Sequence, residues 1–168
     1  MKKKFLCLIV PMVLSLPHCV VQKQYSHPEF IQSLPLAKGH INDFENDFTS
    51  SEIFILDSVI AEFQKQTTNQ IAIVTVSSIA PYDSVDQFTT DLGNYWGVGD
   101  KKKNNGLMIV FSKARREVWI GTGTGTEKIL TDIVCKQIID AYMLPRFKEG
   151  NYFEGVHSGL MECIKHWQ

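Results

Sequence analysis

The sequence lacks a surplus of positive charge, since 17 basic and 18 acidic side chains leave a formal net charge of −1. Nucleic acid is therefore set aside as a main partner, because binding its phosphates normally takes clustered excess Lys and Arg. The chain also has no Cys-x-x-Cys pair, no P-loop ending in Gly-Lys-Ser/Thr and no Gly-x-Ser-x-Gly elbow. These absences argue against a Cys/His metal site, a P-loop nucleotide site and a serine-hydrolase triad. What remains is an ordinary hydrophobic fraction, 44% of 168 residues, which predicts one globular domain with a real core.

The N-terminus has the pattern of a secretory signal. Met1-Lys2-Lys3-Lys4 is followed by about a dozen apolar residues from Phe5 to Leu16, a run too short to span a bilayer. Leu16-Pro17-His18-Cys19 resembles a lipoprotein box, although His18 stands where a small residue is usual. We therefore expect a signal peptide over residues 1–18, lipidation of Cys19, membrane attachment in the cell envelope, and a linker over 19–40. Removing residues 1–18 leaves 14 basic against 18 acidic side chains, a balance of −4.

Two cysteines remain in the part expected to fold, Cys135 and Cys163. In an exported protein such a pair either forms a disulfide or packs as two small apolar side chains. The sequence leaves both alternatives open.

Hydrophobic periodicity predicts alternating helices and strands from residue 41 onward. Capping-box patterns at Thr49-x-x-Glu52 and Ser84-x-x-Gln87 predict two helix starts. Pro145 is expected to stop the third helix, and the short connection over 112–116 predicts a hairpin. The expected helices are 49–67, 84–95, 131–143 and 152–165, and the expected strands are 70–76, 107–111 and 117–120. This order predicts an α/β domain, a small mixed sheet covered by helices on both faces.

Two features suggest chemistry. The Gly-Thr run 121–126 follows a strand, so the N–H groups around Gly121, Gly123, Gly125 and Thr126 either bind an anion or form a plain turn. Oxygen-bearing side chains at loop ends either hold Ca²⁺ or Mg²⁺, or only cap and turn the chain. These candidate ligands are Asp43, Asn104, Asn105 and Asp132. Arg115, at the hairpin tip, either is solvated or reaches a phosphate.

The segments together resemble the TPM domain family, named for a thylakoid phosphatase, a photosystem II repair protein and a receptor modulator. The resemblance covers about residues 41–165. The motifs that carry it are listed here in chain order: Ile41-Asn42-Asp43, Asn69–Val76, Trp96-Gly97-Val98-Gly99, Asn105–Val110, Gly123–Glu127, Leu130-Thr131-Asp132 and Leu144–Tyr152. The resemblance implies a three-layer α/β/α sandwich over residues 41–168, often exported or membrane-anchored. Some family members look like acid phosphatases, some bind Ca²⁺ in a cleft, and others act as assembly or repair factors.

Two departures from the family pattern weaken the metal-dependent activity. The family's Asp-Asn-Gly before the second strand is Asn104-Asn105-Gly106 here, and its acidic hairpin tip is Lys113-Ala114-Arg115-Arg116. We therefore expect an exported, lipid-anchored, non-enzymatic envelope factor that binds another envelope protein. The alternative is a metal-dependent acid phosphatase in which Asp43 and Asp132 are catalytic. Both rest on one expectation, that Asp43, Asn105, Gly123 and Asp132 converge in one cleft.

Overall fold

The computed structural model describes residues 28–168. The predicted signal peptide and the lipidation site Cys19 lie outside the described residues. The elements in chain order are α1 Pro28–Ile31, β1 Ile41–Asp43, α2 Ser50–Thr67, β2 Gln70–Thr75, α3 Val85–Trp96, β3 Gly106–Ser112, β4 Glu117–Thr122, α4 Asp132–Ile138, the π-helix η1 Ile139–Met143, α5 Leu144–Lys148 and α6 Tyr152–Trp167.

The four strands form one mixed sheet in the order β1-β2-β3-β4. β1, β2 and β3 are parallel, and β4 returns antiparallel to β3 through the predicted hairpin. Asp43 is level with Thr75, and Thr75 is level with Phe111, so the carboxyl ends of the parallel strands share one edge. That edge is called the carboxyl edge below, and the opposite one, where β2 and β3 begin, the amino edge.

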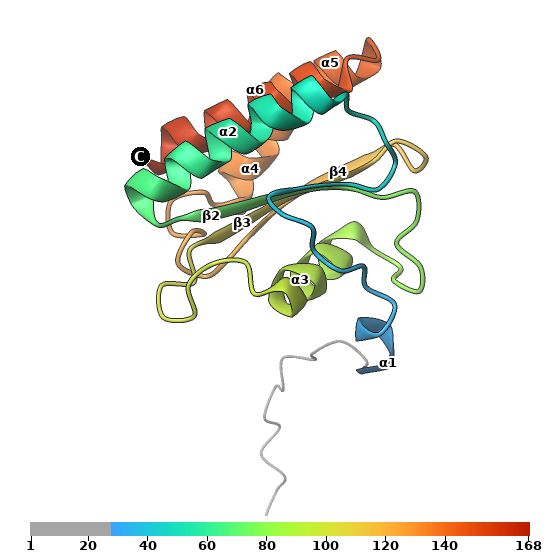
Figure 1. Ribbon diagram of the computed structural model, residues 1–168, viewed down its shortest axis with the longest axis horizontal. Helices are drawn as coiled ribbons and strands as arrows, with labels where there is room; N and C mark the ends of the chain where they lie inside the picture. Colours follow the sequence, from blue (N-terminus) through green and yellow to red (C-terminus); the bar gives the residue numbers. More distant parts are fainter. Residues whose placement is uncertain (1–27) are drawn as a thin grey trace, which may run out of the picture.

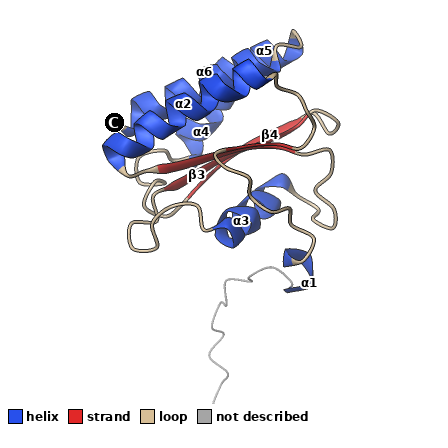
Figure 2. Ribbon diagram, in the orientation of Figure 1, coloured by secondary structure: helices blue, strands red, loops and turns tan. Residues whose placement is uncertain are grey.

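Helices cover both faces of the sheet, as Figures 1 and 2 show. α2, α4 and α6 pack over one face on Ile71, Ile73, Leu107 and Ile109, while α3 packs over the other on Val74 and its neighbours. The β-branched run of β2 and the fully buried β3 supply both cores, as expected of central strands in an α/β sandwich. The three-layer α/β/α sandwich is confirmed. From β1 to β2 and from β2 to β3 the chain moves one strand along the sheet in the same direction. Because α2 and α3 make these two connections on opposite faces, the two parallel crossovers have opposite handedness.

The predicted helix starts are correct, but only one of the two predicted capping boxes forms. The Thr49 hydroxyl accepts from the Glu52 N–H, and the Glu52 carboxylate accepts from the Thr49 N–H at 2.7 Å. Ser84 occupies the N-cap of α3 without a side-chain hydrogen bond.

Pro145 does not stop the helix, contrary to expectation. α4 widens into the π-helix η1, whose last N–H, that of Leu144, donates to the Ile139 carbonyl, and Pro145 follows directly in α5. The helical run therefore continues past a residue that has no N–H to donate.

The predicted linker 19–40 is structured in its described part. α1 lies against α3, Leu34 is buried in the second core, and the Trp96 indole N–H donates to the Pro35 carbonyl at 2.7 Å. The chain therefore joins the α3 layer before the sheet begins. Hydrophobic periodicity does not predict this segment, because individual contacts hold it in place and no apolar face repeats along its sequence.

Cys135 and Cys163 are both buried free thiols. Burial, with the nearby Asp132 charge, raises the pKa of Cys135 to about 11, and burial also raises the pKa of Cys163. Of the two alternatives, the structure therefore has the packed form rather than the disulfide. None of the helices in residues 28–168 combines the length and hydropathy required to cross a bilayer.

Candidate functional site

The predicted convergence of the four site positions is wrong. Asp43 ends β1 at the carboxyl edge, whereas the Asn105 carbonyl accepts from the Gln70 N–H at the start of β2. The two edges are about 16 Å apart, since β2 advances roughly 3.3 Å per residue between Gln70 and Thr75. The Gly-Thr run also contacts the amino edge, so Asp43 lies away from Asn105 and from the predicted glycines.

Asp43 holds its own loop together. Its half-buried carboxylate accepts from the N–H of Asp47 at 3.0 Å, the N–H of Phe48 at 2.9 Å and the hydroxyl of Thr75 at 2.6 Å. Three donors on one carboxylate leave little lone-pair capacity for a metal ion or a water nucleophile. The geometry gives Asp43 the role of a structural cap between β1 and α2.

The Gly-Thr run packs against backbone and does not form the predicted anion cradle. The N–H of Gly123 donates to the Gly106 carbonyl at 2.9 Å, and that of Gly125 donates to the Asn104 carbonyl at 3.0 Å. The N–H of Thr126 is also directed at the Asn104 carbonyl, and its buried hydroxyl donates to Gly106 at 3.0 Å. The N–H groups of Gly123, Gly125 and Thr126 are thus engaged internally, which favours the interpretation of the run as a turn.

The glycines of the run allow a close approach of chains. A methyl group on Gly123 would overlap the Asn104 carbonyl, one on Gly125 would overlap the Lys103 carbonyl, and one on Gly121 would meet Thr89 of α3. None of the three glycines needs a left-handed conformation. Glycine is therefore required at these three positions because a side chain would overlap its neighbours.

The other predicted metal ligands at the amino edge also have local roles. The Asn105 side chain donates to the Thr68 carbonyl and to Asn69 Oδ1, and accepts from the Asp100 N–H at 2.8 Å. Asn104 adopts a left-handed turn with φ 49°, and Asp132 is an exposed first-turn residue of α4, following the N-cap Thr131. Nothing in these contacts brings the three side chains to a common centre.

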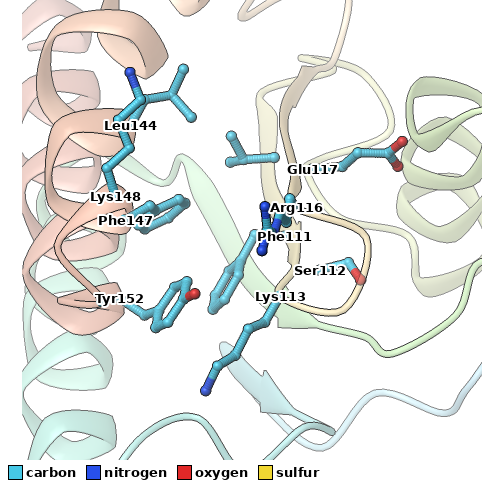
Figure 3. Close-up of a pocket in the computed structure, with 11 residues that line it drawn as sticks. Phe111, Ser112, Lys113, Arg116, Glu117, Leu144, Phe147, Lys148 and Tyr152 are labelled. Atoms are coloured by element: carbon cyan, nitrogen blue, oxygen red, sulfur yellow. The ribbon is translucent and has the colours of Figure 1, made fainter.

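A cavity of about 550 Å³ opens instead at the carboxyl edge, between the β3–β4 hairpin and α5 (Figure 3). Three rings form its apolar side: Phe111 stacks on Tyr152 with centroids 6.0 Å apart, and Phe147 lies 5.4 Å from each. In open α/β sheets, ligands bind outside the carboxyl ends of the strands, because the loops there diverge and leave a crevice. The size also falls within the range of small-ligand pockets.

Three cations line this cavity: Lys113, Arg116 and Lys148. Within residues 28–168, Arg116 and Lys148 have no hydrogen-bonded or ionic partner among the side chains. The carboxylate of Glu117, which also lines the cavity, points away from the rings in Figure 3. It pairs with Arg115, whose Nε and Nη2 lie 2.8 and 3.2 Å from its two oxygens.

That ion pair raises the pKa of Arg115 and takes up its guanidinium. Arg115 was the predicted ligand-binding arginine, whereas the cavity presents its neighbour Arg116. The predicted role therefore does not fit Arg115 in this arrangement.

Lys113 links the cavity to the carboxylates beside it. Its ammonium lies 3.3 Å from Asp47 Oδ1 and 4.9 Å from the centre of the Tyr152 ring, and its backbone N–H donates to the Glu45 carboxylate at 3.1 Å. The Asp47 side chain is only 6% exposed, and its other carboxylate oxygen is buried without a hydrogen-bond partner. Lys113 is thus the cation that balances the charge of this buried acid.

The arrangement does not fit a bound divalent ion. Among the described residues, no three His, Cys, Asp or Glu side chains gather in a way that would hold a metal. The carboxylate of Asp43 already accepts from three donors, and an ammonium already lies against Asp47. A site for Ca²⁺ or Mg²⁺ needs several oxygen ligands around one point, and the acidic side chains of residues 28–168 do not gather in that way at either edge.

The model of one protein family, the TPM domain, matches residues 41–166, three quarters of the chain. This chain belongs to the TPM domain family. A search of curated proteins found no match.

Three solved structures share the fold of this TPM domain. The N-terminal domain of a P. gingivalis protein is 29% identical with a TM-score of 0.72, covering 81% of this chain and 89% of its own. The N-terminal domain of cg2496 from Corynebacterium glutamicum is 15% identical, with a TM-score of 0.61 and coverages of 79% and 82%. BA42 from Bizionia argentinensis is 18% identical, with a TM-score of 0.63 and coverages of 74% and 88%. The last two show the fold alone.

Sequence reasoning missed the residues that line the cavity of this TPM domain. Arg116 was seen only as part of a hairpin tip, and Lys148 and Tyr152 only as part of the family-like tail. The sequence does contain a signal for the hairpin residues, because residues that directly follow parallel strands meet at one edge of a sheet. The contribution of α5 had no such signal, since Pro145 suggested a helix end there.

Proposed function

We propose that this TPM domain is an exported, lipid-anchored accessory factor that binds an acidic segment of another envelope protein at the carboxyl-edge cavity. The observation that carries the proposal is the pair Arg116 and Lys148, two cations that have no side-chain partner within residues 28–168 and lie beside an aromatic wall. Export and anchoring are supported by the cationic and apolar N-terminus and by the Leu16–Cys19 box.

The cavity chemistry favours a protein ligand with two parts. A carboxylate would accept from the planar guanidinium of Arg116 and from the Lys148 ammonium, which are the strong, charge-assisted type of hydrogen bond. An adjoining aromatic or aliphatic side chain would pack on Phe147 and Tyr152. A binding role needs no metal, which agrees with a carboxyl edge whose acids are already engaged by Lys113 and by backbone donors.

Reversing both free charges of the cavity is expected to abolish capture of the partner. A photo-crosslinking amino acid that replaces Val118, which lines the cavity, should form an adduct with an envelope protein in living cells. In Arg116→Glu/Lys148→Glu the adduct should fall at least about tenfold, because a lost charge-assisted hydrogen bond costs roughly 1.5–3 kcal/mol.

The matched control is Lys136→Glu/Lys165→Glu, which makes the same charge change on exposed positions of α4 and α6. It should leave the adduct unchanged. Equal loss in both doubles would mean that net charge, and not the cavity, governs binding. Conversely, divalent-dependent turnover of a chromogenic phosphomonoester that disappears in Asp43→Asn would favour the phosphatase alternative.

Cys19→Ser is expected to release the protein from the membrane fraction. Without an acyl chain, the described residues offer no helix that spans a bilayer. Fractionation of cells expressing either form, followed by washing at high salt, measures the difference. Retention of the variant, or a wild type that is already soluble, would refute the anchor.

A further inference from the structure

The loop that follows α3 carries an exposed cluster of lysines. α3 ends at Gly97 in a left-handed turn, and the loop that follows exposes Lys101, Lys102 and Lys103. The carboxylate of Asp100 accepts from the N–H groups of Lys102 and Lys103 at 2.9 Å, which holds the loop in a defined turn. Lys103 also donates to the Thr68 hydroxyl at 2.8 Å, so the loop is fastened at both ends.

Two exposed apolar side chains lie at the C-terminal end of α3, where this loop begins. The hydrogen bond from Trp96 to Pro35 brings their sequence neighbours, Tyr95 and Leu36, to the C-terminal end of α3. Leu36 is 73% exposed and Tyr95 is 45% exposed. Lysines beside a tyrosine and a leucine are typical of surfaces that lie at the boundary between lipid headgroups and acyl chains.

The chain also enters the domain on this side. Figure 1 shows α1 and the loop after α3 below the sheet, on the side opposite to α2 and α6. Only nine peptide units separate Cys19 from Pro28, which gives a reach of at most about 32 Å. An anchor at Cys19 therefore holds the start of α1, which lies on the α3 side, within about 32 Å of the bilayer.

We infer that the surface formed by Leu36, Tyr95 and Lys101–Lys103 is a membrane-facing surface that binds anionic phospholipid headgroups. This inference rests on the anchor in the proposed function, but not on the cavity. The balance of −4 for the chain after residue 18 does not oppose it, because charges act on headgroups only within a Debye length of about 8 Å. The acids Asp83 and Asp86 lie at the other end of α3 from the lysine loop.

The test places an environment-sensitive fluorophore on the anchored full chain. Asn94→Cys puts the label on the exposed last turn of α3, next in sequence to Tyr95, and Ser58→Cys puts it on exposed α2 as a control. The buried thiols of Cys135 and Cys163 are shielded from the reagent. The protein is reconstituted into vesicles of phosphatidylcholine, with or without phosphatidylglycerol. We expect a blue shift at position 94 only with phosphatidylglycerol, reversed by high salt, and no shift at position 58.

Lys101→Glu/Lys102→Glu should abolish the shift at position 94, since neither ammonium has a partner among the described residues. The control Lys136→Glu/Lys165→Glu changes the net charge equally and should retain the shift. Identical spectra in both vesicles, or equal loss in the two doubles, would overturn the membrane-facing surface alone. Failure of the wild type to float with vesicles would instead refute the anchor and this inference with it.

Discussion

Gly125→Ala is expected to destabilise the domain by about 3 kcal/mol or more. The new methyl group would overlap the Lys103 carbonyl and lie 3.0 Å from the Asn104 carbonyl, which also accepts from the Gly125 N–H. Backbone on both sides of this contact must move apart. The hydrogen bonds that close the loop 100–105 onto the segment 123–126 would then lengthen together. Urea unfolding followed by circular dichroism measures the change.

Gly93→Ala is the matched control, a substitution of the same size elsewhere. In α3 its methyl group would meet only the flexible Met108 side chain, at 3.3 Å. Alanine is favoured over glycine inside a helix by up to about 1 kcal/mol, so this variant should be neutral or slightly more stable. If Gly125→Ala unfolds at the wild-type urea concentration, the close backbone packing described for the Gly-Thr run is incorrect.

Asp43→Ala should cost about 3 kcal/mol of stability, because three donors lose a charged acceptor at once. Two of them are backbone N–H groups at the entrance to the buried Phe48, and the third is the buried Thr75 hydroxyl. Thermal or urea unfolding of the variant measures this loss. Asp43→Asn should lose roughly half as much, since its remaining oxygen still accepts from Asp47 and Thr75 while its amide faces the Phe48 donor.

This prediction affects how activity measurements are interpreted. A lost activity in Asp43→Ala would follow from a loosened carboxyl edge even if Asp43 never touched a substrate. Asp43→Asn keeps more of the loop and is therefore the better probe of catalysis. A wild-type-like stability of Asp43→Ala would contradict the capping role and return Asp43 to consideration as a free carboxylate.

Several elements follow from local sequence because their causes are local. Thr49 and Glu52 begin α2 through bonds that join residues three apart, and the apolar residues of β3 need only a sheet to bury them. Ser84 shows the limit of such patterns, since its helix begins where expected without the predicted side-chain bond. The sequence pattern also did not predict how far the helix after Thr131 extends. It continues through Pro145 as η1 and α5, which pack on α6.

The site was predicted less well, and the error has a simple geometric cause. Asp43 ends its strand, whereas Asn105 precedes its own, so parallel strands place them at opposite edges. Gly123 lies beyond the end of the antiparallel β4 and returns to the amino edge beside Gly106. Family resemblance suggested a cleft but did not specify an edge.

The sequence by itself determined the α/β class, most helix and strand positions and the family, because periodicity, capping and ordered motifs act over short stretches of chain. Only the tertiary structure decided which side chains share a cavity. The direction of the strands and the packing of α5 bring Arg116, Lys148 and Tyr152 together. This arrangement depends on contacts between residues more than 30 positions apart in the sequence. The same long-range packing uses the Gly-Thr amides and the Asp43 carboxylate internally, which turned apparent ligands into supports of the fold.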